Sequence, residues 1–509
     1  MRVKTILKTI LILMLFSVGS KFLGFFREVL IANYFGSTFF TDAFYLALGI
    51  LALFKVMLTA TISTTLIPIL AKINDNEIKM KFISNLKGLS LGFSILIIIA
   101  VYLLAETIVS MIGIGLNNVQ IEFVAKLVKI GIWVVIFSAA AGINRGYFQS
   151  EGSFTESAIT DLPFNLVYIF YLIFFSSIYG IEGLMVASVL AVVSQVLLQQ
   201  WTLRKLKFKY VPHINIKDEY IINIIKLAPP ILFSVSIIEI NNLIDKMLAT
   251  KVSEGVVSAL AYSSRVNLII ISLFIVIIST VLFPLLSQKV QKKDYEELNK
   301  ITTLSINSIV ILMTPIMFFV FNYSYLIIEL LFERGAFIKE DTLITSEALK
   351  YYSIGLLAFS LRTFLDKVFY SFQDTKTPFI NSFFLVVINI ILSIVLVKYF
   401  EHKGLAFATS LAAIITTFWL LYRLKSKLKS FRFRPLTIIV ITSIAIHIVW
   451  YELLNICTKD MDINLGIYFI INMFFVIIYF LILKIFKVKE IEYIYSGIVK
   501  KLKKRKKVL

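Results

Sequence analysis

The sequence predicts an all-α polytopic membrane protein, on the basis of its composition, its apolar runs and the sidedness of its charges. Of 509 residues, 59% are hydrophobic and only 16% are charged, whereas about 25% of residues are charged in an ordinary soluble domain. A single Cys excludes a disulfide framework, and three scattered His residues cannot complete a zinc site with it. The composition therefore indicates a membrane protein without redox or zinc chemistry.

Long apolar runs separated by polar clusters predict fourteen spanning helices, because a span needs about 20 mostly apolar residues. We expect these helices, in chain order, near residues 7–33, 39–71, 85–105, 122–147, 157–179, 181–203, 221–250, 256–288, 300–321, 343–371, 379–399, 403–424, 435–455 and 463–487. The first run begins with basic residues, as a signal peptide does. Lys21 interrupts it and no small-residue cleavage site follows, so we expect a retained helix.

The positions of the 51 Lys and Arg residues indicate an even number of crossings. Most of them lie at the two termini and in the loops after even-numbered helices. The loops after odd-numbered helices hold few: Lys251, Arg334, Lys339, Lys398, Lys403 and Lys459. Cytoplasmic loops are rich in Lys and Arg, so both termini are expected in the cytoplasm. The basic tail, 491–509, is expected to lie on anionic lipid headgroups, without a nucleic-acid partner.

Three motifs recur in the same order at almost one offset, which predicts two related halves. The pairs are 63–70 with 279–286, Phe148-Gln149 and Asn165 with Phe372-Gln373 and Asn389, and 183–188 with 404–409. We therefore expect an N-terminal lobe of six helices in 1–210, a C-terminal lobe of six in 211–430, and two further helices in 431–490. Two such halves around a central cavity are typical of alternating-access transporters.

Ionisable residues interrupt several of the predicted spans: Lys21, Arg27, Glu28, Lys55 and Arg265. A cation at the bilayer centre costs about 2.5 to 3.5 kcal/mol, so such side chains normally face protein or a water-filled cavity. Their positive surplus suits an anionic substrate that carries phosphate groups. The alternatives are snorkelling to the surface or an internal ion pair between Lys21 and Glu28, which share a helical face.

Two acidic positions have open interpretations. Asp42 begins the second helix near the predicted outer surface, where it would either close the cavity by pairing with a cation or cap its own helix beside Thr41. In the second half, oxygen ligands for a hard cation such as sodium come from Asp245, Asn389, Ser393 and Thr409. Interhelical hydrogen bonding, or neutralisation of Asp245 by Lys246, would explain the same residues.

Five segments resemble the MurJ (MviN) lipid II flippase family, within the multidrug/oligosaccharidyl-lipid/polysaccharide exporter superfamily. They are 20–28, 41–44, 333–337, 370–378 and 404–410, and the most specific is Gln373-Asp374-Thr375-Lys376-Thr377-Pro378. The resemblance implies fourteen helices in two lobes and no chemical catalysis. It also implies transfer of undecaprenyl-pyrophosphate-linked peptidoglycan precursor, lipid II, from the inner to the outer leaflet of the bacterial cytoplasmic membrane. The helices in 431–490 would form a groove for the lipid tail.

Carried over by residue, the resemblance assigns pyrophosphate binding to Lys21, Arg27, Lys55 and Arg265. Gating is assigned to Asp42, and we add Glu28 to it. A sodium ion, the one cofactor suggested, would be held by Asp245, Asn389, Ser393, the backbone carbonyl of Leu405 and Thr409. The family commonly has Arg where this sequence has Lys at two cavity positions, and Asp where it has Ser393.

Three other functions stay open at this point. The first is a flippase for another polyprenyl-linked oligosaccharide. The second is a cation-coupled drug exporter, which the positive surplus disfavours because such substrates are usually cationic. The third is a non-transporting scaffold whose basic tail recruits cell-wall synthesis enzymes. No nucleotide-binding loop occurs, so a gradient or the supply of substrate, rather than ATP, would drive transport.

Overall fold

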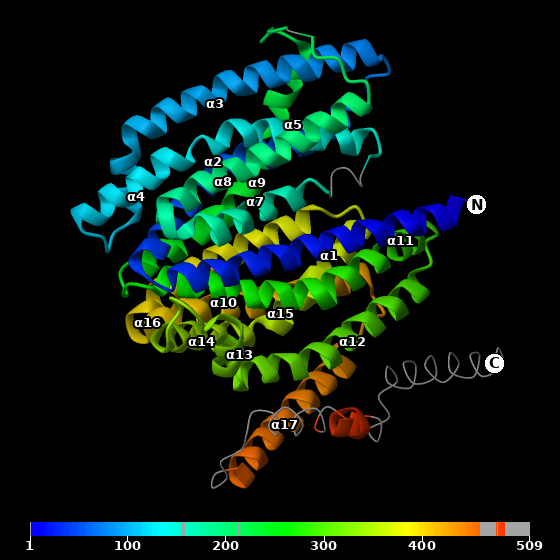
Figure 1. The fold of residues 1–509 in the computed structure, drawn as a ribbon. Coiled ribbons are helices and arrows are strands. Elements are labelled where there is room, and N and C mark those ends of the chain that lie inside the picture. The colour runs from blue at the N-terminus through cyan, green and yellow to red at the C-terminus, as the bar shows by residue number, and fades with distance from the viewer. Residues whose placement is uncertain (1, 154–158, 212, 459–474, 476, 484–509) are drawn as a thin grey trace, which may run out of the picture. The chain divides into compact units, whose positions relative to one another are not determined.

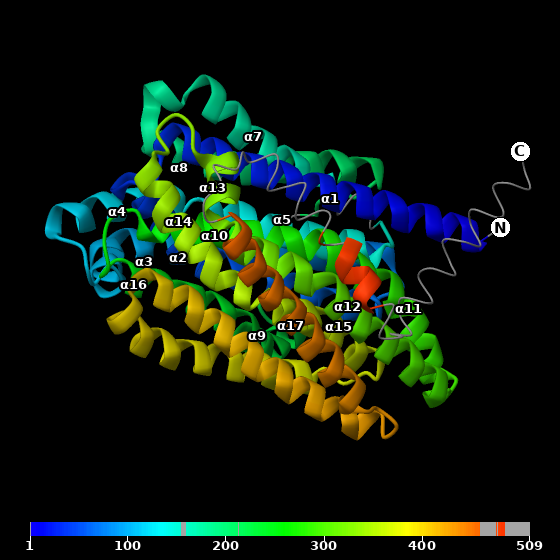
Figure 2. The same ribbon diagram turned by 90° about the horizontal axis from the view of Figure 1, so that it is seen from below.

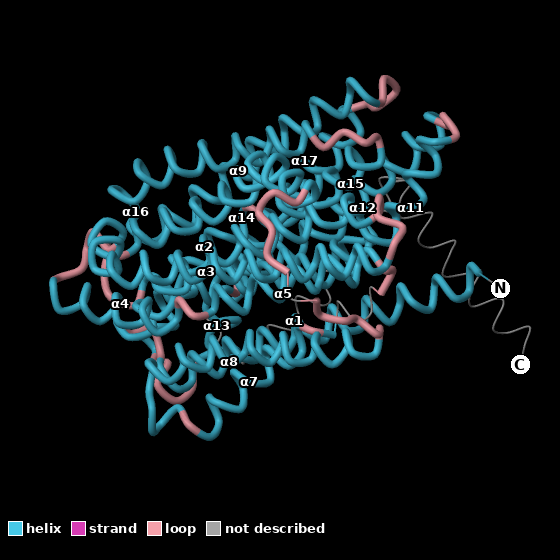
Figure 3. Tube along the Cα trace, turned by 90° about the horizontal axis from the view of Figure 1, so that it is seen from above, coloured by secondary structure: helices cyan, strands magenta, loops and turns pink. Residues whose placement is uncertain are grey.

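The computed structural model describes residues 2–153, 159–211, 213–458, 475 and 477–483. These residues form helices joined by short loops, with no strand among them, which confirms the all-α fold class (Figure 3). The longer helices, in chain order, are α1 (Arg2–Phe35), α2 (Phe39–Leu70), α3 (Asn76–Ile112), α4 (Asn118–Gly131), α5 (Val134–Ser150), α7 (Asp161–Phe174), α8 (Ser176–Lys205), α9 (Glu219–Ala249), α10 (Val256–Ile271), the π-helical turn η1 (Ser272–Val276), α11 (Ile277–Gln291), α12 (Tyr295–Asn322), α13 (Ser324–Phe332), α14 (Lys339–Ile354), α15 (Leu356–Ser371), α16 (Lys376–Lys427) and α17 (Phe433–Thr458).

Several of these helices can cross a membrane. Within the described part of the chain, six are long and apolar enough: α2, α3, α8, the continuous stretch Val256–Gln291, α12 and α16. The bent pair α4 and α5 would add a seventh. The chain is therefore a multi-pass membrane protein, and the count of fourteen spans stays a prediction. The last predicted span, 463–487, lies largely outside the described residues, and the basic tail, 491–509, lies wholly outside them.

Two sharp breaks divide long helices where the sequence predicts the chain to turn. Gly180 interrupts α8 with φ 55° and ψ −148°, and Glu401 interrupts α16 with φ 52° and ψ −134°. A positive φ suits glycine but is unusual for glutamate. The two breaks lie 221 residues apart, which is the offset between the repeated motifs 183–188 and 404–409. The backbone thus repeats the same turn in both predicted halves.

One compact unit contains the described residues of Met1–Leu273, Tyr323–Tyr352 and Phe379–Ala412. In it, α2 packs against α4, α5 and α9 (Figure 1). Gly142 and Gly146 of α5 face Thr59 and Ser63 of α2 at backbone contact distance, and the Ser63 hydroxyl donates to the Gly142 carbonyl at 2.8 Å. Small residues let membrane helices approach in this way. In the same unit α1 packs along α7 and α10 (Figure 2), which positions the charged residues of α1.

A second compact unit contains the described residues of Phe274–Asn322, Ser353–Pro378 and Ala413–Leu509. In it, α15 packs against α11 and α12, and α17 packs against α12. Asp374, in the most specific family motif, accepts hydrogen bonds from the backbone and hydroxyl of Thr377 and from Lys427. Burial opposes these bonds but they outweigh it, so the pKa of Asp374 is lowered. The motif therefore caps α16. The lobe boundaries, 1–210 and 211–430, and the groove in 431–490 stay predictions.

Candidate functional site

The carboxylate of Glu28 is the centre of a charged cluster in the first unit. Glu28 is 1% exposed. One of its oxygens, Oε1, lies 2.6 Å from Nη2 of Arg27 and 3.4 Å from Nε of Arg265. The other, Oε2, accepts a hydrogen bond from the hydroxyl of Tyr45. The ion pair of Lys21 with Glu28 that the sequence suggested does not form: two arginines, one from α1 and one from α10, take that place.

Arg27 is held in position by side chains of α7. Its guanidinium lies 4.8 Å from the ring centroid of Tyr168 and 5.6 Å from that of Phe164. Its Nη1 donates to the side-chain oxygen of Asn165 at 3.4 Å. Its buried Nε has no hydrogen-bond partner among the described residues. Arg27 therefore keeps one buried donor without a protein partner in the described part of the chain.

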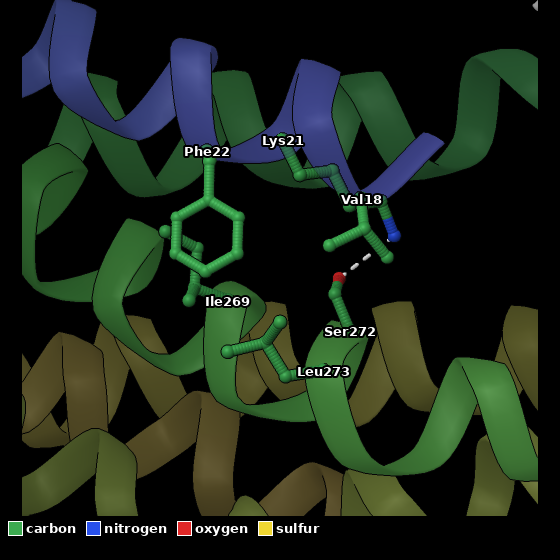
Figure 4. A pocket seen from close by; sticks show the side chains of 6 residues that line it. All are labelled: Val18, Lys21, Phe22, Ile269, Ser272 and Leu273. Atoms are coloured by element: carbon green, nitrogen blue, oxygen red, sulfur yellow. Dashed lines mark hydrogen bonds between the residues drawn. The ribbon is translucent and has the colours of Figure 1, made fainter. Parts of the chain in front are cut away.

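The remaining two predicted cations lie in different places. Lys55 of α2 places its Nζ 5.3 Å from the ring centroid of Phe164, so Lys55 and Arg27 both lie beside this ring of α7. Lys21, six residues before Arg27 on α1, donates instead to the hydroxyl of Ser272 at 2.9 Å (Figure 4). It lines a small hollow with Val18, Phe22, Ile269, Ser272 and Leu273.

The cluster carries surplus positive charge. Glu28 neutralises one charge equivalent of the two arginines that contact it, and Lys55 adds a cation with no acidic partner in the described ion pairs. The side chain of Arg265 is half exposed. An exposed and a partly buried cation side by side form a site that suits phosphate oxygens, for which arginine offers paired donors and lysine a point charge.

Asp42 caps a helix other than its own. Its Oδ2 accepts from the backbone N–H of Gly255 at 2.7 Å, and its Oδ1 accepts from the N–H and the hydroxyl of Ser258 at 2.7 and 2.6 Å. These groups belong to the first turn of α10, whose N–H groups have no partners within the helix. Asp42 contacts no cation in the described ion pairs. Both earlier interpretations, cation pairing and a cap on its own helix, therefore give way to a cap supplied from α2 to α10. Its gating role stays a prediction.

All five residues of the predicted ion site lie together. The hydroxyl of Ser393 donates to the Asp245 carboxylate at 2.9 Å. The amide of Asn389 is 3.1 Å from the Ser393 hydroxyl and 2.9 Å from that of Thr409. The Thr409 hydroxyl in turn donates to the backbone carbonyl of Leu405 at 3.1 Å. These residues can present carboxylate, hydroxyl, carbonyl and amide oxygens to a cation. Oxygen ligands suit a hard cation, so the set fits one. Asp245 bonds Ser393 here; its neutralisation by Lys246 does not occur, because the Lys246 ammonium donates to the backbone carbonyl of Tyr45 at 2.8 Å.

Sequence reasoning missed several residues of the charged cluster. Tyr45 bonds Glu28, and Phe164 and Tyr168 face Arg27. Asn165 appeared in the sequence only as a member of the repeat. The available signal was the spacing on α7: Asp161, Phe164, Asn165 and Tyr168 recur at three and four residues, and so share one helical face. Lys246 was considered only as a partner for Asp245.

Comparison with known proteins agrees with these features. A family model described as lipid II flippase MurJ matches residues 31–482. A probable lipid II flippase MurJ of Buchnera aphidicola subsp. Baizongia pistaciae is 31% identical over 427 residues, which cover 82% of this chain and 83% of that protein.

Solved structures match as well. A lipid II flippase MurJ in an inward closed conformation has a TM-score of 0.78 and 25% sequence identity, and the match covers 96% of this chain and all of that one. An inward-facing multidrug resistance transporter of the MATE family, in the MOP superfamily, has a TM-score of 0.68 at 15% identity, covers 81% of this chain and 96% of its own, and shows a shared fold. From the family match over most of its length, this chain belongs to the lipid II flippase MurJ family.

Proposed function

We propose that this chain is a lipid II flippase. It moves the undecaprenyl-pyrophosphate-linked peptidoglycan precursor from the inner to the outer leaflet by alternating access, and it catalyses no chemical reaction. The observation that carries the proposal is the family match across residues 31–482. The charged cluster around Glu28 supports it, because a surplus of cations suits a pyrophosphate. The same surplus disfavours a drug exporter for cationic substrates.

In this proposal the pyrophosphate binds the cations of the cluster. Arg265 offers its half-exposed side chain, the buried Arg27 beside Glu28 adds a second charge, and Lys55 adds a third. Lys21 lies earlier on α1 and would meet the substrate at another depth. Glu28 holds the two arginines together, and the arginines would turn from its carboxylate towards the phosphates when the substrate binds. This gives Glu28 a part in gating, since arginine contacts change between empty and loaded forms.

Asp42 is proposed as the second gating residue. It joins α2 of the predicted N-terminal lobe to α10 of the predicted C-terminal lobe through backbone hydrogen bonds. Alternating access requires the two lobes to separate on one side at a time. Loss of the Asp42 bonds would therefore accompany opening on the side where α10 begins, which the charge distribution predicts to be the outer side.

A sodium ion is proposed at the cluster of Asp245, Asn389, Ser393, Leu405 and Thr409. When bound, sodium would supply a positive charge that neutralises Asp245. The residues of this chain bring α9 and the two halves of α16 together there, through the hydrogen bonds of Ser393 with Asp245 and of Asn389 with Thr409. Coupling of that junction to transport is part of the proposal.

The remaining features complete the proposed setting. We place the protein in the bacterial cytoplasmic membrane with fourteen spans in two lobes and both termini in the cytoplasm. Membrane lipids are partners throughout. The helices in 431–490 would hold the lipid tail, and the basic tail, 491–509, would contact anionic lipids or cell-wall synthesis enzymes.

The cavity cations provide the test of substrate binding. Arg265→Ala should leave normal amounts of folded protein in the membrane but fail to support growth when the variant is the only flippase, and Arg27→Ala should fail in the same way when compared at equal amounts of folded protein. Arg265→Ala leaves the 2.6 Å pair of Glu28 with Arg27 in place, so its folding should be nearly normal. Lysine at either position should keep part of the activity, because a point charge still attracts phosphate. Lys126→Ala, which removes an exposed ion pair with Glu182, is the matched control.

A structural role predicts a different pattern. Breaking a buried ion pair by removing one partner costs about 3 to 5 kcal/mol, so the alanine variants would then lose folded protein and Glu28→Ala would restore it. That rescue, or full growth of either alanine variant, would exclude pyrophosphate binding at the cluster. Transport of labelled lipid II into vesicles, compared with another polyprenyl-linked oligosaccharide, decides the identity of the headgroup.

A further inference from the structure

The segment that joins α8 to α9 carries basic side chains that the flippase mechanism does not use. We call its described residues, 206–211 and 213–218, the α8–α9 strap. The strap begins where the apolar span α8 ends, five residues after Trp201, whose side chain is 55% exposed. Tryptophan in spanning helices gathers at the membrane–water interface. The strap therefore lies at the level of the lipid headgroups.

Buried groups of α3 hold the strap in one conformation. Asn85 and Asn215 bond reciprocally: the Asn85 amide donates to the Asn215 carbonyl at 2.9 Å and accepts from the Asn215 N–H at 2.8 Å. The N–H of Val211 donates to the Ser84 hydroxyl at 3.0 Å. Ser84 and Asn85 are both fully buried, so these bonds are shielded from water. The strap is a preformed surface rather than a free loop.

The turn into the strap directs its lysines outward. Lys207 has φ 57°, in the left-handed region that favours glycine. Its N–H donates to the Arg204 carbonyl, and the N–H of Phe208 donates to the Leu203 carbonyl, both at 3.0 Å, which is the helix ending that normally uses glycine. The Phe208 ring packs 5.5 Å from that of Tyr147. With Phe208 held inside, the flanking Lys207 and Lys209 are exposed.

The exposed surface is basic and apolar at once. Its cations are Arg204, Lys205, Lys207, Lys209 and Lys217, and none of them forms an ion pair with a described residue. The nearby lysines of α3 differ, because Lys79 pairs with Glu151 and Lys81 with Glu77. Two isoleucines, Ile214 and Ile216, are 73% and 67% exposed between these cations. Large aliphatic side chains in water are unfavourable, so this surface needs a partner that is anionic outside and apolar within.

We propose that the α8–α9 strap binds anionic phospholipids of the adjoining leaflet, with Lys207 and Lys209 on the headgroup phosphates and Ile214 and Ile216 in the acyl boundary. A charged lipid surface has this combination, since lysines are attracted to its anionic headgroups while apolar side chains enter the layer beneath. A zwitterionic phospholipid has no net charge to attract the lysines. The proposal does not depend on which lipid-linked substrate the protein carries.

A reporter cysteine on the strap tests the proposal. Ile216→Cys in a Cys457→Ser background of the full chain is placed in nanodiscs of phosphatidylcholine, with or without phosphatidylglycerol. Labelling uses an uncharged, polyethylene-glycol-linked maleimide, which an anionic surface does not repel. Each Lys side chain near an anionic membrane surface contributes about 1 kcal/mol to binding, which strengthens it about five-fold. Lys207→Gln/Lys209→Gln should therefore weaken the phosphatidylglycerol-dependent protection of the Ile216→Cys reporter from labelling roughly 25-fold. High salt should weaken the same protection in the reporter variant that keeps both lysines.

Matched variants separate this binding from general effects. Lys292→Gln/Lys293→Gln removes two exposed lysines from another loop and should leave the protection unchanged. Lys207→Arg/Lys209→Arg keeps the charge and should preserve protection, which excludes misfolding as the cause of its loss. Glu296→Cys in place of the strap reporter should be labelled equally in both lipids. Equal labelling of the strap in both lipids, protection that survives loss of the lysines, or protection by soluble glycerol phosphate alone would overturn the proposal.

Discussion

Replacing Asp42 with Ala is expected to weaken the junction between α2 and the N-terminus of α10. The carboxylate accepts from the N–H groups of Gly255 and Ser258, both at 2.7 Å, and from the Ser258 hydroxyl at 2.6 Å. A buried N–H left without a partner costs about 1 to 3 kcal/mol, so the two cost about 2 to 6 kcal/mol. When the helices separate, both groups bind water. The cost therefore falls on the joined state alone.

The reporter for this shift is Val257→Cys in a Cys457→Ser background, because Val257 is 2% exposed in the joined state. A difference of 1.4 kcal/mol is a factor of ten in an equilibrium constant. The rate of labelling by a water-soluble maleimide, which follows the separated population, should rise at least roughly 30-fold in Asp42→Ala. Ser258→Ala loses a hydroxyl bond worth about 1 kcal/mol but keeps both backbone bonds, and should raise the rate only about five-fold.

The outcome that refutes this reasoning is an unchanged labelling rate in Asp42→Ala when the variant is inserted in normal amounts. Asp42 would then be an incidental cap. Asp42→Asn keeps one acceptor oxygen and should give an intermediate rate. A rate in Asp42→Asn equal to that of Asp42→Ala would show that the charge of the carboxylate, rather than its geometry, joins the two helices.

Two further predictions concern the ion site and the topology. If Asp245 and Thr409 hold sodium, sodium but not potassium should raise the melting temperature of the purified protein, since a ligand stabilises the state that it binds; Asp245→Asn should abolish this rise and Asp341→Asn should not. A melting temperature indifferent to sodium would remove the ion from the site. Cysteines at either terminus, or in place of Lys292 or Lys293, should resist labelling from outside intact cells, and labelling at any of them would contradict fourteen spans with both termini in the cytoplasm.

The helical architecture could be predicted from the sequence because it depends on local chemistry. A bilayer leaves no partner for backbone polar groups, so an apolar run that spans it becomes a helix or part of a closed barrel. The breaks at Gly180 and Glu401 lie where the apolar pattern ends. The five residues of the proposed sodium site, Asp245 included, also lie close together. Four of them come from the one long helix α16, where spacing and a single sharp turn already restrict their distances.

Ion-pair partners could not be predicted in the same way. Spacing along α1 places Lys21 and Glu28 on one face, yet Glu28 contacts the adjacent Arg27 and Arg265 of α10. Asp42 likewise bonds a helix more than 200 residues away rather than a cation or its own N-terminus. Periodicity shows which face of a helix a side chain occupies, but its partner depends on which helix packs there and at what height. Those contacts come from long-range packing, which decides the electrostatics of the site.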